Sequence, residues 1–300
     1  MIEVEHLSKV YGTTSAIQDI AFTVAAGEIM GFLGPNGAGK TTTMRILTGY
    51  LPATTGTARI AGYDVHEDSL AVRQRIGYLP EMPPLYPDMS VECFLHFVAR
   101  IKGVAAGDRP KQIDLAIARC NLEEKRQVLI RKLSKGFRQR VGLAQAIVHN
   151  PPVIVLDEPT VGLDPRQING VRNLIKSLAG DHTIVLSTHI LPEVSMTCDR
   201  VTIVNRGRVV ATDTPDQLMA QLAGSVGYDL EVEGNAMLVE PLLRVTPGVR
   251  DVELSALAGG RWAIRAIAEP GAEPGRELAA TVVNTGLSLH EMRRARPTLE

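Results

Sequence analysis

The chain has 300 residues, of which 45% are hydrophobic and 22% are charged, so it is large enough for about two globular domains and is not disordered throughout. Its 32 lysine and arginine residues are balanced by 33 acidic residues, which gives a formal charge of −1. Because nucleic-acid binding requires a positive excess, this balance excludes a protein that coats nucleic acid and predicts no nucleic-acid partner.

Strand-like and helix-like segments alternate through the first two thirds of the chain. Glu28 to Leu33 is predicted to be a strand that enters a glycine-rich turn, and Thr41 to Leu51 the helix that follows. The β-branched runs Val153 to Leu156 and Thr183 to Leu186 are typical of buried parallel strands. This order predicts an α/β domain with a largely parallel sheet over residues 1–224.

A helical insertion is predicted within this domain, over about residues 86–148. Two sets of apolar residues recur there at helical spacing: Phe94, Phe97, Val98 and Ile101, and then Phe137, Val141, Ala144 and Val148. Pro151-Pro152 is expected to end the second helix.

Residues 225–300 are predicted to form a small second domain of the α+β class. Its expected elements are a strand near Tyr228, a helix over Met237 to Leu243, strands at Val252 and Trp262 joined by a turn at Gly259-Gly260, a helix over Glu277 to Asn284, and a strand over Leu287 to Leu289. The order βαββαβ predicts a ferredoxin-like fold.

The sequence shows neither a membrane-spanning segment nor a cysteine motif for disulfides or metal. No apolar run approaches the roughly 18 residues of a membrane helix, and the N-terminus carries acids where a signal peptide has basic residues. Cys93, Cys120 and Cys198 form no CxxC or Cys/His cluster, which suits a reducing compartment and predicts no zinc site. We therefore expect a cytoplasmic protein that reaches a membrane only through partners.

The run from Gly34 to Thr41 (Gly-Pro-Asn-Gly-Ala-Gly-Lys-Thr) fits the phosphate-binding pattern GxxxxGK[ST] at every fixed position. Its glycines allow several backbone N–H groups to point at one phosphate, and the following helix adds the positive end of its dipole. Lys40 is predicted to reach the β- and γ-phosphates, and the Thr41 hydroxyl to hold Mg²⁺.

Two more predicted strands end in polar residues. Asp157 and Glu158 follow a buried strand, and their side chains must point to opposite faces, so one can support Mg²⁺ while the other faces the attacking water. His189 ends the next strand and is a candidate donor to a γ-phosphate oxygen. Ligands of open α/β sheets bind at this edge, which favours a shared site over ordinary strand ends.

With these residues, the chain resembles the ATP-binding subunits of ABC transporters over about residues 1–220. The most specific segment is Leu133 to Arg140 (Leu-Ser-Lys-Gly-Phe-Arg-Gln-Arg), which resembles the signature motif of that family. Further positions match family motifs in order: Tyr11 the aromatic that stacks on adenine, Glu81 the Q-loop glutamine, Gly162-Leu163-Asp164 the D-loop, and His189 the switch histidine.

The resemblance implies a P-loop nucleotide site for ATP and Mg²⁺. The nucleotide contacts it implies are Tyr11, Gly34, Asn36, Gly37, Gly39, Lys40, Thr41, Thr42, Asp157, Ser134, Gly136 and Asp164. Glu158, His189 and Glu81 are expected to be catalytic, and Thr41, Asp157 and Glu81 to hold the metal. Ser134 and Gly136 of the signature segment would contact the nucleotide of a second copy in a head-to-tail dimer.

Two departures from the family pattern narrow the resemblance. Lys135 and Phe137 replace a glycine and a glutamine of the signature, and Glu81 replaces the Q-loop glutamine. Together with Gly77 to Glu81, they resemble the exporter branch that works with multi-spanning ABC-2 type membrane subunits, nearest to the gliding-motility-associated subfamily. A subunit at the cytoplasmic face of the inner membrane is therefore expected.

Two surfaces near the signature region each fit two roles. The segment Glu81 to Tyr86 is expected to dock a membrane subunit, whereas Phe94 and Phe97 fit either that surface or ordinary helix core. The basic residues of the signature region are either a solvated face or help to attract ATP of the second copy: Arg131, Lys132, Lys135, Arg138 and Arg140. The end of the chain, Arg296 to Glu300, resembles the start of a motif that runs further in relatives.

Two other classes of function compete with a transporter ATPase. A soluble ABC ATPase that acts on ribosomes would usually carry two phosphate loops, and one that acts in DNA repair a long coiled coil; neither pattern is visible. A small-molecule kinase would share the phosphate loop but lack the signature segment and His189.

Overall fold

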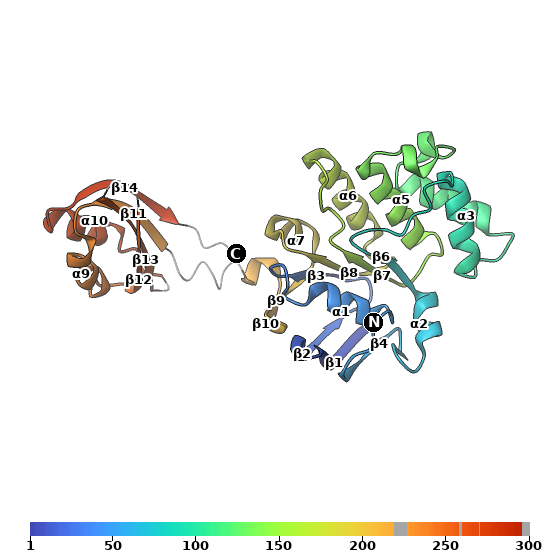
Figure 1. Cartoon of the computed structure of the whole chain (residues 1–300), viewed down its shortest axis with the longest axis horizontal. Helices are drawn as coiled ribbons and strands as arrows, with labels where there is room; N and C mark the ends of the chain where they lie inside the picture. The colour runs from blue at the N-terminus through green and yellow to red at the C-terminus, as the bar shows by residue number, and fades with distance from the viewer. Residues whose placement is uncertain (219–226, 258–259, 270, 296–300) are drawn as a thin grey trace. The chain divides into compact units, whose positions relative to one another are not determined.

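The structure, a computed structural model, describes residues 1–218, 227–257, 260–269 and 271–295. The chain divides into two compact units, residues 1–215 and 216–300 (Figure 1). The boundary predicted at Gly224-Ser225, the turn residue Gly259 and the tail from Arg296 lie outside the described residues, so those predictions stay untested.

A six-stranded sheet in the order β10-β9-β3-β8-β7-β6 forms the centre of the first unit. Its strands are β3 (Ile29–Leu33), β6 (Ile76–Leu79), β7 (Val153–Asp157), β8 (Thr183–Thr188), β9 (Arg200–Asn205) and β10 (Arg208–Asp213). All neighbours pair in parallel except β9 and β10. Every residue of β3, β7 and β8 is buried, as their apolar runs predict, and these three strands end at one edge of the sheet.

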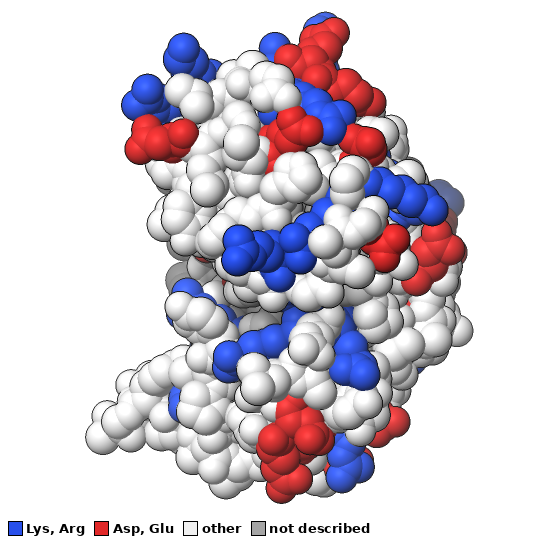
Figure 2. Space-filling view, turned by 90° about the vertical axis from the view of Figure 1, so that its right-hand side faces the viewer, with Lys and Arg blue, Asp and Glu red and all other residues white. Residues whose placement is uncertain are grey.

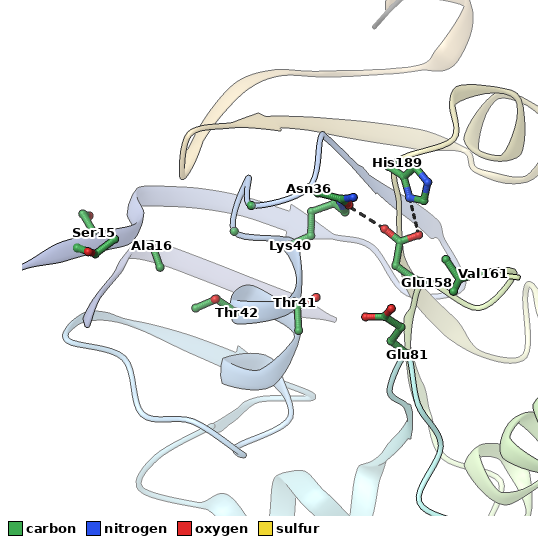
Figure 3. Close-up of a pocket in the computed structure, with 13 residues that line it drawn as sticks. Ser15, Ala16, Asn36, Lys40, Thr41, Thr42, Glu81, Glu158, Val161 and His189 are labelled. Atoms are coloured by element: carbon green, nitrogen blue, oxygen red, sulfur yellow. Dashed lines mark hydrogen bonds and ion pairs between the residues drawn. The ribbon is translucent and has the colours of Figure 1, made fainter. Parts of the chain in front are cut away.

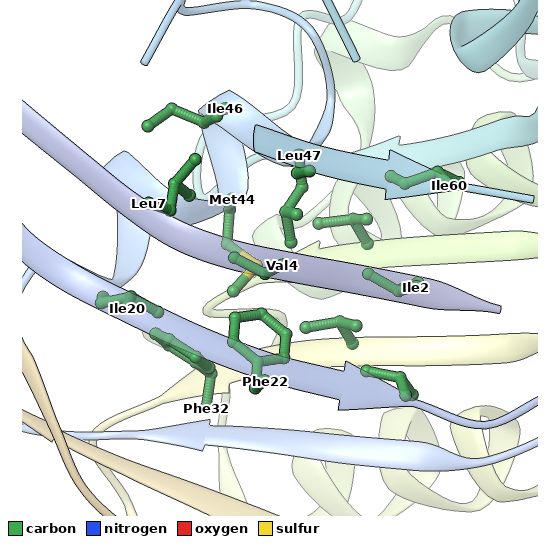
Figure 4. Close-up of a cluster of buried hydrophobic side chains, with 14 of the residues drawn as sticks. Ile2, Val4, Leu7, Ile20, Phe22, Phe32, Met44, Ile46, Leu47 and Ile60 are labelled. Carbon is green, nitrogen blue, oxygen red and sulfur yellow. The ribbon is translucent and has the colours of Figure 1, made fainter. Parts of the chain in front are cut away.

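A second, antiparallel sheet has the order β2-β1-β4-β5. Its strands are β1 (Ile2–Tyr11), β2 (Thr14–Val24), β4 (Thr55–Ile60) and β5 (Tyr63–Asp64). Helix α1 (Lys40–Leu47) contributes Met44, Ile46 and Leu47 to the core that this sheet shares with Phe32 of β3 (Figure 4). The core thus anchors the phosphate loop at both of its ends.

Helix α1 ends at Leu47, four residues before the predicted end at Leu51. Gly49 has a φ of 65°, the left-handed conformation that commonly ends a helix. The helical prediction failed there because apolar Leu51 continues the periodic pattern beyond this turn.

The helical insertion and the outer helices belong to the first unit. They are α2 (Ser69–Arg75), α3 (Val91–Ile101), α4 (Arg109–Arg119), two short 3-10 helices (Glu123–Lys125 and Ile130–Lys132), α5 (Lys135–Ile147), α6 (Pro165–Leu178) and α7 (Leu191–Thr197). Phe94 and Val98 of α3 are buried, but Ile101 is 66% exposed. Ile101 is the last residue of α3, so the predicted apolar face stops one turn short of the helix end.

The second unit contains a four-stranded antiparallel sheet in the order β12-β13-β11-β14. Its elements are β11 (Gly227–Glu233), a 3-10 helix (Ala236–Leu238), α9 (Glu240–Arg244), β12 (Val249–Ala256), β13 (Arg261–Ala268), α10 (Gly275–Asn284) and β14 (Ser288–Ala295). Along the chain the order is βαββαβ. In the sheet, β11 is a central strand and β12 an edge strand, as expected for a ferredoxin-like fold. One face of β11 packs into the core through Leu230, whereas Asp229 on the other face pairs with Arg265 and Arg293.

Within the described part of the chain, no helix combines the length and the apolar character needed to cross a membrane. The three cysteines are free thiols. Cys120 and Cys198 are buried and Cys93 is exposed.

Candidate functional site

The phosphate loop runs from the end of β3 to the start of α1. Gly39 precedes the helix with a φ of 103°, which a residue with a side chain rarely adopts, so the glycine here is required by the backbone. Lys40 then folds back over the loop, and its Nζ donates hydrogen bonds to the carbonyl oxygens of Gly34 (2.7 Å) and Pro35 (3.2 Å). The loop therefore encloses the buried ammonium group of Lys40.

Glu158 lies between Lys40 and His189 (Figure 3). Its Oε1 is 3.3 Å from Nζ of Lys40, and its Oε2 is 2.9 Å from Nδ1 of His189. The side chains of Lys40 and Glu158 are 6% and 8% exposed, whereas that of His189 is 40% exposed. Three strand ends thus bring an ammonium, a carboxylate and an imidazole into one chain of contacts.

Asp157 is the last residue of β7, and its side chain has partners different from those of Glu158. Its Oδ1 accepts hydrogen bonds from the hydroxyls of Ser187 (2.6 Å) and Thr41 (3.3 Å). Hydroxyl and carboxylate oxygens are the ligands that Mg²⁺ prefers, and Glu81 adds a carboxylate at the wall of the same pocket. The oxygen donors of Thr41, Asp157 and Glu81 therefore fit the predicted metal.

The backbone holds Glu158 in an unusual conformation. Its φ is 49°, which is uncommon for a residue with a side chain, and its N–H donates to both the carbonyl and the hydroxyl oxygen of Ser187, each at 3.1 Å. Ser187, which sequence reasoning missed, thus fixes both acids: its backbone holds Glu158 and its hydroxyl holds Asp157. Serine at a strand end gives no recognisable signal of this role.

A pocket of about 430 Å³ opens over the loop. Nine of the predicted nucleotide, metal and catalytic residues line it, together with Val161 and three residues at the start of β2: Asn36, Gly37, Gly39, Lys40, Thr41, Thr42, Glu81, Glu158, His189, Thr14, Ser15, Ala16 and Val161. Val161 and the three β2 residues were not predicted, because their motifs carry no distinctive side chain.

Six predicted nucleotide residues do not line this pocket: Gly34 and Asp157, which lie beside it, and Tyr11, Ser134, Gly136 and Asp164. Tyr11 ends β1, is 45% exposed and has the ammonium of Lys9 at 5.4 Å from its ring centroid. Ser134, Gly136 and Asp164 lie on α5 and α6, outside the pocket of this copy. Their assignment to nucleotide contacts stays a prediction.

Ser134 and Asp164 are both helix caps. Ser134 accepts a hydrogen bond from the N–H of Phe137 at the start of α5, and Asp164 accepts one from the N–H of Gln167 at the start of α6. Gly136 is buried against the side chain of Gln167, so the signature segment and the start of α6 are in contact. Ser134 itself stays exposed and accessible to another molecule.

One buried amide links α5 to the acidic strand end. Gln139 is 5% exposed, and its Nε2 donates to the carbonyl oxygen of Pro159, the residue after Glu158, at 2.8 Å. The helix that begins at Ser134 is therefore bonded directly to the backbone beside Glu158.

Comparison with known protein families finds the ABC transporter family over residues 17–161. The linearmycin resistance ATP-binding protein LnrL of Bacillus subtilis (strain 168) is 32% identical over 86% of this chain and 83% of its own length. The Nod factor export ATP-binding protein I of Ralstonia nicotianae is 34% identical over 85% of this chain and 79% of its own length.

Among solved structures, the dimeric structure of MJ0796, a bacterial ABC transporter cassette, superimposes with a TM-score of 0.66 and 25% identity. The match covers 72% of this chain and 99% of that one. The predicted P-loop fold of the first unit is confirmed by this likeness, whereas the coverage leaves more than a quarter of this chain without a counterpart there.

Proposed function

Because this chain belongs to the family of ABC transporter ATP-binding subunits, we propose that it hydrolyses ATP to drive export through separate membrane subunits. The observation that carries the proposal is the position of the Glu158 carboxylate, 3.3 Å from the ammonium of Lys40 and 2.9 Å from the imidazole of His189. A carboxylate base beside a phosphate-binding ammonium is what attack of water on a γ-phosphate needs.

Each residue has a distinct role in the proposed reaction. Glu158 orients the attacking water and accepts its proton, Lys40 binds the β- and γ-phosphate oxygens, and His189 donates a hydrogen bond to the γ-phosphate. Mg²⁺, held by Thr41, Asp157 and Glu81, supplies charge neutralisation of the phosphates when bound. The Lys40–Glu158 ion pair must open when ATP enters, since phosphate oxygens then take the place of the carboxylate.

Phosphate release from MgATP by the purified protein tests this activity, with and without its membrane subunits. We expect magnesium-dependent hydrolysis that the membrane subunits alter. Absence of phosphate release in the intact complex would contradict the proposal. Hydrolysis by a protein that never co-purifies with a multi-spanning membrane protein would instead favour the soluble ABC ATPase class.

We also propose that two copies bind head to tail around two ATP molecules. Ser134 is exposed at the start of α5, and Asp164 is exposed at the start of α6, so the two helix starts are free to face a nucleotide held by the other copy. The dimeric MJ0796 cassette supports this arrangement by its likeness to the first unit. Light scattering with ATP tests it: we expect a dimer for Glu158→Gln and a monomer for the same variant without nucleotide.

The direction of transport and the subfamily are inferred from likeness. Relatives include a Nod factor export protein, and the runs Gly77 to Glu81 and Lys135 to Arg140 resemble exporters with ABC-2 type membrane subunits. We propose that the chain is such an exporter subunit, near the gliding-motility-associated subfamily, held at the cytoplasmic face of the inner membrane. Direct identification of the co-purified membrane protein and its cargo tests this assignment.

A groove on the side of α2 and α3 is the surface that we propose for docking of the membrane subunit. It consists of two adjoining hollows of about 600 and 390 Å³ that share Tyr50, Tyr78 and Lys102. Met82 and Pro84, from the segment predicted to dock, line the second hollow, but the ring of Tyr86 packs against those of Phe94 and Phe97. Phe94 is thus core, which fits the simpler of its two predicted roles.

The charge of this groove indicates the chemistry of its partner. Arg45, Arg73 and Lys102 line it, and the lining residues include no acidic side chain. Figure 2 shows this side of the molecule, where lysine and arginine side chains flank a central hollow and many acidic side chains lie toward the upper and lower ends. Burial and the nearby Arg73 lower the pKa of Lys102, so an approaching carboxylate would stabilise its charged form.

We therefore propose that a short amphipathic segment with at least one carboxylate docks here. Tyr50 (78% exposed) and Met82 (83% exposed) offer apolar contact on the two sides of the groove. Tyr50→Ala combined with Met82→Ala should abolish detergent co-purification of the membrane subunit. The matched control Leu115→Ala, 45% exposed on α4, should retain it. Retention by the double variant would place docking elsewhere.

A further inference from the structure

Glu193 occupies a buried position that the proposed reaction leaves unexplained. It lies in α7, is 6% exposed, and within the described ranges takes part in no ion pair. Burial of a carboxylate without a cation costs several kcal/mol, and an apolar residue at such a site is often neutral or stabilising. The carboxylate is therefore poorly explained by stability, and the groups that it contacts indicate another role.

Both carboxylate oxygens of Glu193 accept hydrogen bonds from threonine hydroxyls. Oε1 accepts from Thr160 at 2.6 Å, and Oε2 accepts from Thr188 at 2.9 Å. The oxygen of Thr188 in turn accepts a hydrogen bond from the N–H of Ile190 at 3.1 Å. Two donors thus converge on one side chain, and only a carboxylate offers both of them an acceptor oxygen in this geometry.

The two threonines belong to the two segments that carry the reacting groups. Thr188 directly precedes His189, and its bonds to Glu193 and Ile190 hold the backbone on both sides of that histidine. Thr160 is two residues after Glu158, in the turn closed by the hydrogen bond from the N–H of Val161 to the carbonyl oxygen of Glu158 (3.2 Å). Glu193 therefore bridges the segment of the base to the segment of the histidine.

The same turn continues into the next predicted motif. The carbonyl oxygen of Thr160 accepts a hydrogen bond from the N–H of Leu163 at 3.2 Å, in the segment Gly162-Leu163-Asp164. Each end of the bridge is thus fixed by its own backbone bonds. Glu193 spans the distance between them, in addition to the contacts that Ser187 and His189 make with the acidic segment.

We propose that Glu193 is a positioning residue for ATP hydrolysis, which sets the separation of Glu158 and His189 by binding Thr160 and Thr188 simultaneously. It touches neither nucleotide nor water, and it acts only through the two threonines. This inference rests on the proposed ATPase activity. It explains the buried carboxylate of Glu193, which does not itself line the pocket over the phosphate loop.

Variants with matched shapes separate positioning from folding. Glu193→Gln keeps the size of the side chain but leaves one acceptor oxygen for two hydroxyls. Thr160→Val and Thr188→Val each remove one hydroxyl, while Thr160→Ser and Thr188→Ser retain it. The control is Thr197→Val on the same helix, because Thr197 is buried and its hydroxyl has no hydrogen-bond partner in the described structure.

Steady-state ATP hydrolysis and equilibrium ATP binding are measured for each variant. We expect Glu193→Gln and the two valine variants to lower kcat about 10- to 100-fold, because a misplacement of about 1 Å can have that effect. KM, ATP affinity and the thermal midpoint should stay near wild type, the serine variants should recover kcat, and Thr197→Val should match wild type. Unchanged kcat in Glu193→Gln, or no recovery with serine, would overturn the proposal.

A readout without nucleotide keeps this inference distinct from the activity itself. The ring nitrogens of His189 are observed by NMR in the full chain, where we expect their resonances to move in Glu193→Gln and to stay in place in Thr197→Val. If the His189 resonances move in Glu193→Gln but the wild type does not hydrolyse ATP, the positioning role of Glu193 is supported and the ATPase proposal is rejected. Unmoved resonances would reject the bridge whether or not the wild type hydrolyses ATP.

Discussion

The ammonium of Lys40 lies 3.3 Å from the carboxylate of Glu158 although 118 residues separate them in the chain. Both side chains are almost fully buried, so this ion pair is desolvated and geometrically constrained. Because Lys40 is also bonded to two loop carbonyl oxygens, it stays in place when Glu158 exchanges for a phosphate. The position of Lys40 is therefore set before a nucleotide binds.

Glu158 is the base of the proposed reaction. Glu158→Gln should lower the rate of ATP hydrolysis by at least about 100-fold, since the amide cannot accept the proton of water. ATP affinity should be retained or increased, because the variant no longer competes with phosphate for Lys40. Phosphate release and equilibrium binding of ATP check these two effects. Glu67→Gln, an exposed carboxylate outside the pocket, is the control, and normal turnover of Glu158→Gln would refute the assigned role.

Lys40→Ala should weaken the binding of ATP. Loss of the ammonium removes charge-assisted hydrogen bonds to phosphate oxygens, each worth about 1.5–3 kcal/mol, so the Kd for ATP should rise at least about 10-fold. Titration of the protein with a fluorescent ATP analogue measures it. Lys111→Ala on the exposed side of α4 should bind as the wild type does. Wild-type affinity in Lys40→Ala would show that the loop is not the phosphate site.

Stability should depend on pH through His149. Burial and the nearby Lys102 lower the pKa of this histidine to about 4, from an ordinary value of 6.5. Between these pH values the unfolded chain binds a proton that the folded protein does not. The contribution of His149 to the free energy of unfolding is therefore fully present above about pH 6.5 and is lost as the pH falls to about 4. The loss attributable to this group is at most about 3 kcal/mol.

Urea unfolding at pH 7.5 and pH 5 checks this dependence. His149→Gln cannot titrate and can still donate to the carbonyl oxygen of Ile76, the partner of the histidine ring. We expect a smaller loss of stability on acidification in this variant than in the wild type. His6→Gln, an exposed histidine, should behave as the wild type. Equal losses in all three proteins would exclude His149 as the cause.

The core beneath the loop should be sensitive to truncation. Leu47 of α1 is fully buried between the two sheets, so Leu47→Ala should lower the free energy of unfolding by about 2–5 kcal/mol. Leu70→Ala, 75% exposed on α2, should change it little. Urea midpoints of both variants decide the matter, and similar values would show that the core around α1 is loosely packed.

Fixed spacing determined which parts of the site were predictable from sequence. Lys40 and Thr41 follow a glycine pattern, and Glu158 and His189 each end an apolar strand, so parallel-sheet geometry alone indicates that they meet. Glu193 and Ser187 have no such pattern, since their roles depend on contacts between segments that are distant in the chain. The same holds for the groove, where Tyr50 comes from the segment after α1 and Lys102 from the end of α3.

The extent of the buried face of α3 was predicted wrongly for a local reason. Ile101 continues the apolar spacing of Phe94 and Val98, yet it lies at the end of α3 and lines the groove instead of the core. Helical periodicity predicts a face but gives no information on where packing partners stop. The order βαββαβ of the second unit was easier to predict, because alternating strands and turn residues fix each element locally.

The hydrogen bond from Gln139 to the carbonyl oxygen of Pro159 joins α5 to the backbone beside Glu158. If Ser134 at the start of α5 contacts a nucleotide on another copy, a movement of this helix would also move the residue that follows Glu158. Binding of nucleotide to one copy would then align the base of the other, so that neither of two paired sites would hydrolyse ATP before both hold a nucleotide.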